Sequence, residues 1–142
     1  MNVIVKDVTI ESKPGDNFFI SRFSARLPTT PKGVVVLTPG SNGDGRQDIH
    51  DVSWTRFADE HNLALVGVNF VDLKPSATEL YVNAGKGSGD ALLTALDKFG
   101  LGKVPLLLWG FSAGGEFNYE LACFLAPLQP KRIKAFVVNK GG

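Results

Sequence analysis

Residues 106–116 read LLLWGFSAGGE, and this stretch decides the fold. The apolar run that contains its start, Val104 to Trp109, is typical of a strand covered on both faces in a parallel sheet. Beyond it, Phe117, Leu121 and Phe124 recur at the spacing of a buried helix face. The stretch therefore predicts a strand, a sharp glycine-rich turn and a helix.

The turn carries the pattern Gly-x-Ser-x-Gly, formed by Gly110, Ser112 and Gly114. A serine between a buried strand and a helix N-terminus is the setting of a nucleophile elbow, whose strained backbone lifts the hydroxyl above the sheet. We expect that a β-carbon at either glycine would collide with a neighbouring strand or helix. The amide of Ala113 opens the helix and is predicted to face a developing oxyanion. The alternative is a plain turn in which Ser112 caps the helix.

The rest of the chain alternates between strand and helix patterns. Alternating apolar and polar residues predict an antiparallel hairpin from Val3 to Glu11 and from Phe18 to Leu27. Three more apolar runs, Gly33 to Leu37, Leu63 to Val68 and Ile133 to Val138, predict buried strands with helices between them. We expect an α/β fold, in which the hairpin precedes parallel strands with helices on both faces.

Length and composition fit one globular domain over residues 1–142. Hydrophobic residues make up 44% of the chain and charged residues 20%, which excludes a disordered or fibrous protein. The net charge of +1 gives no indication of a nucleic-acid partner. We expect no membrane span, no metal and no cofactor, because no apolar run is long enough and no ligand set has metal spacing.

The single cysteine and the N-terminus bear on localisation. Cys123 cannot form an intramolecular disulfide, and its apolar neighbours predict a buried, inert thiol. The segment from Met1 to Lys6 has no signal-peptide pattern. We expect a cytoplasmic protein, or a secreted one whose signal peptide is not part of this sequence.

A second oxyanion donor is expected in the loop after the first parallel strand. Residues 38–45 read TPGSNGDG, and their three glycines allow backbone amides to turn inward. We predict that the Ser41 amide is the donor, with the Asn42 amide as the alternative. A flexible surface turn is the other interpretation of this loop.

On these residues the chain resembles the α/β-hydrolase family. It is most similar to the esterase branch that includes polyhydroxybutyrate depolymerases and feruloyl or acetylxylan esterases. The hairpin, the loop from Pro39 to Gly45 and the elbow from Gly110 to Gly114 carry the resemblance, although Pro39-Gly40 stands where many members have His-Gly. The resemblance implies hydrolysis of carboxylic esters through an acyl-serine at Ser112.

The resemblance also implies a triad in the chain order serine, acid, histidine. No Asp or His follows Ser112, and the later acids Glu116 and Glu120 belong to the helix that leaves the elbow. His50 and His61 come earlier and are expected on the surface, with a pocket position for His50 as the alternative. We therefore expect the acid and histidine outside this chain, and little activity from the chain alone.

An uncovered apolar strand at residues 133–138 would be unusual for a parallel sheet and would invite pairing with more polypeptide. We therefore interpret the chain as the N-terminal portion of a hydrolase fold whose last strands are missing. The predicted partner of this edge is a missing C-terminal portion or a second chain. The expected substrate is a small-molecule or polymer-linked ester.

Other residues near the predicted site admit more than one interpretation. Asn42, Phe70 and Phe111 are candidates for the pocket lining, and Asp72 ends a strand at the edge where α/β sheets bind ligands.

Two other functions stay open. One is dinucleotide binding: the glycines of residues 40–45, followed by Asp72, resemble a dinucleotide-binding motif with its ribose-binding acid. Their spacing differs from the usual Gly-x-Gly-x-x-Gly. A non-catalytic binding protein with the hydrolase fold would explain the absent base.

Overall fold

The computed structural model describes residues 2–74 and 79–139, which form one six-stranded sheet in the order β1-β2-β4-β3-β5-β6. β2 pairs antiparallel with β1 and with β4, and the remaining neighbours are parallel. The predicted hairpin and the parallel strands after it are confirmed. The strands are β1 (Val3–Glu11), β2 (Ile20–Pro28), β3 (Gly33–Thr38), β4 (Leu63–Val71), β5 (Leu106–Phe111) and β6 (Ile133–Asn139).

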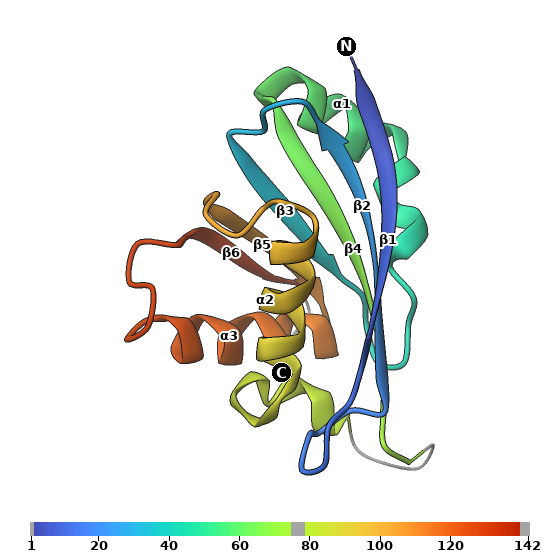
Figure 1. The fold of residues 1–142 in the computed structure, drawn as a ribbon, viewed down its shortest axis with the longest axis vertical. Coiled ribbons are helices and arrows are strands. Elements are labelled where there is room, and N and C mark those ends of the chain that lie inside the picture. The colour runs from blue at the N-terminus through green and yellow to red at the C-terminus, as the bar shows by residue number, and fades with distance from the viewer. Residues whose placement is uncertain (1, 75–78, 140–142) are drawn as a thin grey trace.

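Helices cover both faces of the sheet, as predicted (Figure 1). α2 and α3 pack on one face over the larger apolar core, and α1 packs on the other over a smaller one. The helices are α1 (Val52–His61), α2 (Ser88–Lys98) and α3 (Ala113–Leu125), with short 3-10 turns η1 (Arg46–His50), η2 (Leu80–Val82) and η3 (Ala84–Lys86).

Local sequence explains where the helices begin and end. The Asp51 carboxylate accepts a hydrogen bond from the Ser53 amide and caps the start of α1. α2 places Leu92, Ala95 and Leu96 in the core, and Gly100 follows its end with φ +78°, a backbone angle that suits glycine.

The expected burial of Cys123 is wrong. The inward face of α3 carries Phe117, Leu121 and Leu125, which are fully buried. Position 123 falls between these turns of the helix, so its thiol is exposed. No helix within residues 2–74 and 79–139 has the length and apolar character needed to cross a membrane.

The strand β6 lies at one edge of the sheet and is exposed along most of its length. Phe136, Val137 and Val138 have exposed fractions of 42%, 48% and 40%. Alternate side chains of a strand point to opposite faces, so both faces of β6 are partly exposed, including the face toward α3. This arrangement is unlike an ordinary parallel sheet, whose strands are buried on both faces.

Candidate active site

The turn between β5 and α3 holds Ser112 in an unusual backbone conformation, with φ +54° and ψ −117°. Such a conformation costs a residue with a side chain about 1–3 kcal/mol, so the surroundings must enforce it. The Ser112 amide donates to the carbonyl oxygen of Asn139 at 2.8 Å. The carbonyl oxygen of Ser112 accepts a hydrogen bond from the Gly115 amide, also at 2.8 Å. The serine is thus tied to both β6 and α3.

The side chain of Ser112 takes no part in holding the turn. It is half-buried and makes no capping hydrogen bond to α3. The interpretation of Ser112 as a helix cap is therefore wrong, since a cap needs that bond. A serine whose backbone is strained while its hydroxyl is unused by the fold is suited to a chemical role.

Close backbone approach explains the two glycines of the motif. A β-carbon on Gly110 would lie 2.5 Å from the Asn118 side-chain nitrogen and against the backbone of Gly114. A β-carbon on Gly114 would overlap the carbonyl oxygen of Thr38 and lie 2.6 Å from that of Pro39. The predicted collisions are confirmed, and they come from both the helix and the neighbouring strand.

The loop after β3 lies directly beside the serine. A β-carbon placed on Gly40 would be 3.7 Å from Cβ of Ser112 and 3.3 Å from Cδ1 of Phe111. The amide of Gly43 donates to the carbonyl oxygen of Gly40 at 2.9 Å, which closes a tight turn over residues 40–43. The loop after β3 thus forms a hydrogen-bonded turn beside Ser112, with Ser41 and Asn42 exposed at its centre.

The amides of this loop differ in what they bind. Asn42 has φ +56°, and its amide donates to the phenol oxygen of Tyr81 at 3.3 Å. The Gly45 amide donates to the carbonyl oxygen of Val68. The Ser41 amide, in contrast, has no acceptor within residues 2–74 and 79–139. The Asn42 amide is thus already bonded, which favours the Ser41 amide as the oxyanion donor.

Sequence reasoning missed two residues that hold the loop. Asn69 donates from Nδ2 to the carbonyl oxygen of Gly43 at 3.1 Å, and Tyr81 accepts from the Asn42 amide. A polar side chain inside the apolar run of β4 was a usable signal for Asn69. Tyr81 had no local signal, because 39 positions separate it from its partner.

The predicted pocket residues separate into two groups. Phe70 is 3% exposed and packs on Phe23, Tyr81 and Phe117, so its assignment to the pocket is wrong. The reason is the alternation of side chains along β4, which points Phe70 into the larger core with Val66 and Val68. Phe111 is 41% exposed and adjoins Gly40, which keeps it as a candidate for the wall of a pocket.

The dinucleotide alternative is poorly supported by this geometry. A pyrophosphate needs free amides from the glycine-rich loop, whereas those of Asn42, Gly43 and Gly45 are already bonded. The proposed ribose-binding acid, Asp72, is 6% exposed, and burial raises the pKa of its carboxyl group. The nearby amides of Tyr81 and Leu80 partly oppose that rise.

The other titratable candidates lie on the surface. His50 and His61 are exposed, and His61 packs on the ring of Phe57 at the end of α1. Glu116 and Glu120 are exposed on α3. In the described part of the chain, no three His, Cys, Asp or Glu side chains gather as a metal site would require.

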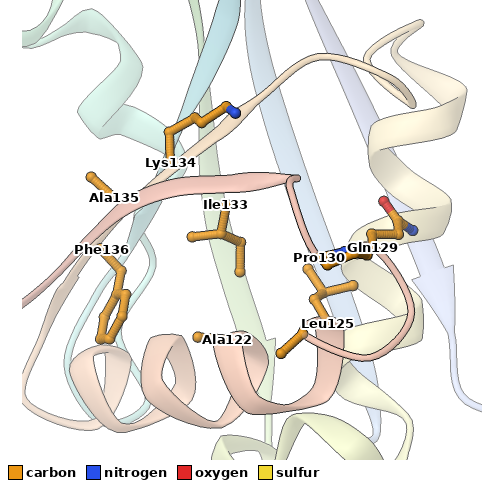
Figure 2. A pocket seen from close by; sticks show the side chains of 9 residues that line it. Ala122, Leu125, Gln129, Pro130, Ile133, Lys134, Ala135 and Phe136 are labelled. Atoms are coloured by element: carbon orange, nitrogen blue, oxygen red, sulfur yellow. The ribbon is translucent and has the colours of Figure 1, made fainter.

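A hollow of about 440 Å³ lies between α3 and β6 (Figure 2), and Ser112 is not one of its lining residues. Ile133 and Phe136 point from β6 toward α3, where Ala122 and Leu125 line the other side. The hollow adjoins the first residues of β6 and the end of α3. Ser112 instead lies at the carboxyl edge of the sheet, where α/β folds bind ligands.

Comparison with solved structures identifies the fold. Vibralactone cyclase matches 98% of this chain with a TM-score of 0.70 at 13% identity, the match covering 43% of that protein. The poly(3-hydroxybutyrate) depolymerase LpqC of Bordetella parapertussis matches 95% with a TM-score of 0.67 at 19% identity, over 51% of its length. A bacterial heroin esterase matches 99% with a TM-score of 0.67 at 18% identity, over 45% of its length.

These matches show that the chain has the α/β-hydrolase fold and spans about half the length of the structures it matches. The predicted resemblance to the esterase branch is therefore confirmed at the level of the fold. At the level of sequence, the chain matches no protein family and no curated protein.

Proposed function

We propose that this chain is the N-terminal part of a serine hydrolase that cleaves carboxylic esters through an acyl-serine intermediate. The conformation of Ser112 carries the proposal: a strained serine, half-exposed and unused as a cap, stands beside a glycine-rich loop. A strained backbone such as that of Ser112 is kept where function requires it, because an ordinary helix start would avoid the cost in conformational free energy.

In the proposed reaction, a histidine transfers the protons, Ser112 is the nucleophile and two backbone amides bind the oxyanion. A histidine from outside this chain takes the proton of the Ser112 hydroxyl, whose oxygen attacks the ester carbonyl carbon. The amides of Ser41 and Ala113 donate to the resulting oxyanion. The same histidine protonates the departing alcohol, and it then activates a water molecule that releases the acid and restores the serine.

The acid and histidine of the triad come, in this proposal, from polypeptide that covers β6. The side chains of Phe136, Val137 and Val138, each 40–48% exposed, supply an apolar edge and partly exposed faces for it. Backbone groups at an open strand edge favour addition of a further strand. The occupant is either the remainder of a longer chain or a second chain.

The names of the fold neighbours support the same class of reaction. They include a depolymerase of poly(3-hydroxybutyrate), a heroin esterase and a fluorophosphonate-binding serine hydrolase of Staphylococcus aureus. Each of these acts on its own substrate, and the proposal takes from them only the ester class.

Ester turnover by the complete protein, with the polypeptide that supplies the acid and histidine, tests the proposal. We expect hydrolysis of 4-nitrophenyl esters to fall by about 10³-fold or more in Ser112→Ala, because the nucleophile is lost. Ser53→Ala, an exposed serine of α1, is the matched control and should hydrolyse them at the wild-type rate.

A second candidate is a non-catalytic binding protein that keeps the same fold. Equal turnover by the wild type and Ser112→Ala would support that alternative and contradict ester hydrolysis at this serine.

A further inference from the structure

We infer that Tyr81 is a positioning residue for the oxyanion loop: its phenol oxygen holds the Asn42 amide, so that the neighbouring Ser41 amide is presented to the substrate. This inference rests on the proposed function, which supplies the reaction. It concerns a buried residue whose hydroxyl bonds to the oxyanion loop and not to Ser112.

The ring of Tyr81 is held from several sides. Only 2% of the residue is exposed, and its ring stacks on Phe70 with a centroid distance of 5.3 Å and an angle of 27°. Phe70 in turn contacts Phe117 of α3 at 4.9 Å. The tyrosine is thus coupled through one aromatic residue to the helix that begins at the elbow.

The backbone of Tyr81 is equally well fixed. Its carbonyl oxygen accepts from the Ser88 hydroxyl at 2.7 Å. Asn17 donates from Nδ2 to the carbonyl oxygens of Leu80 and Asn83, at 2.9 and 2.8 Å. A side chain with both its ring and its backbone restrained can hold a loop without moving with it.

The phenol oxygen is the one polar contact between Tyr81 and the loop. It accepts from the Asn42 amide at 3.3 Å, and Asn42 has a positive φ of 56°. Burial raises the pKa of the phenol to about 12, so the group stays neutral in any ordinary assay. The hydrogen bond therefore holds Asn42 in its left-handed conformation across the working pH range.

This contact also selects between the two candidate donors. Asn42 and Ser41 are the central residues of the turn that the Gly43 amide closes on Gly40. With Asn42 occupied by Tyr81, the Ser41 amide is left without an acceptor in the described part of the chain. Loss of the phenol oxygen should let the turn reorient, and the Ser41 amide would then lose its alignment.

The test compares Tyr81→Phe with Tyr119→Phe in the complete protein. Tyr81→Phe keeps the stacked ring and removes only the acceptor oxygen, whereas Tyr119 is the chain's other tyrosine and is 56% exposed. We expect Tyr81→Phe to lower kcat for a 4-nitrophenyl ester by about tenfold or more with KM unchanged, since the lost contact acts in the transition state. Tyr119→Phe should leave both constants unchanged.

A double-mutant cycle separates positioning from general support of the fold. Ser41→Pro removes the Ser41 amide at a turn position where proline is favoured. If Tyr81 acts through that amide, Tyr81→Phe should lower kcat less than about twofold in the Ser41→Pro background. Hydrogen exchange in peptides covering residues 40–45 should also be faster in Tyr81→Phe than in the wild type.

The outcomes distinguish failure of the inference from failure of the proposed function. An unchanged kcat in Tyr81→Phe would overturn the inference, and so would an equal loss in the wild-type and Ser41→Pro backgrounds. If Ser112→Ala leaves turnover intact, the proposed function itself fails. A Ser112-dependent enzyme that tolerates Tyr81→Phe would contradict only the role of Tyr81.

Discussion

Replacement of Gly114 by alanine is expected to damage both the fold and the site. The new β-carbon would overlap the carbonyl oxygen of Thr38 and lie 2.6 and 2.7 Å from the Pro39 oxygen and the Thr38 carbonyl carbon. All three atoms are backbone, so none can rotate away as a flexible side chain would. The end of β3 and the start of α3 must separate.

The expected change in the free energy of unfolding follows from two opposing effects. Overpacking of this kind costs about 1–3 kcal/mol or more, while alanine in a helix gains up to about 1 kcal/mol over glycine. Because the collision involves backbone on both sides, we expect the free energy of unfolding to fall by about 2 kcal/mol. With a urea dependence of about 2 kcal/mol per molar, the unfolding midpoint should fall by about 1 M.

Urea denaturation of the complete protein, with ester turnover measured alongside it, is the assay. The control is Gly85→Ala: Gly85 is exposed, and a β-carbon there meets no atom closer than 3.7 Å. Turnover should fall in Gly114→Ala even where the protein is fully folded, because the loop that carries Ser41 moves away from Ser112. A Gly114→Ala protein with wild-type midpoint and wild-type turnover would refute the reasoning.

Two further predictions concern the oxyanion loop and a buried acid. Ser41→Pro should lower kcat by about 10²–10³-fold, and Ser41→Ala, which keeps the amide, should have little effect; equal kinetics in the two variants would show that the amide is not a donor. Asp72→Asn should raise the free energy of unfolding at pH 7. Burial raises the Asp72 pKa in the folded state, so the ionised carboxylate destabilises the native protein. The resulting decrease in the free energy of unfolding grows as pH rises through and above the ordinary pKa of 3.8. Urea titrations from pH 7 downward should therefore show the variant's advantage shrinking; an advantage that does not depend on pH would contradict this cause.

The sequence predicted the architecture well because its strongest signals are local. The apolar run into the Gly-x-Ser-x-Gly turn, and the helix spacing after it, depend only on near neighbours along the chain. The same holds for Gly100 at the end of α2, whose positive φ the structure confirms.

The errors arose where distant contacts decide the outcome. Phe70 near the carboxyl end of β4 is a pocket candidate by its place in the strand, yet the alternation of the strand points it into the core with Val66 and Val68. Tyr81 was missed because its role depends on a contact with Asn42, far away along the chain. Cys123 is exposed because the burial of a helix residue depends on the face it occupies, not on the apolar character of its neighbours in sequence.

The most direct test of the central claim is covalent labelling of the complete protein with a fluorophosphonate, followed by peptide mass spectrometry. An activated serine at the elbow should carry the phosphonate at Ser112, and Ser112→Ala should take up none. A wild-type protein that stays unlabelled, or that is labelled at a different serine, would contradict the claim that Ser112 is the nucleophile.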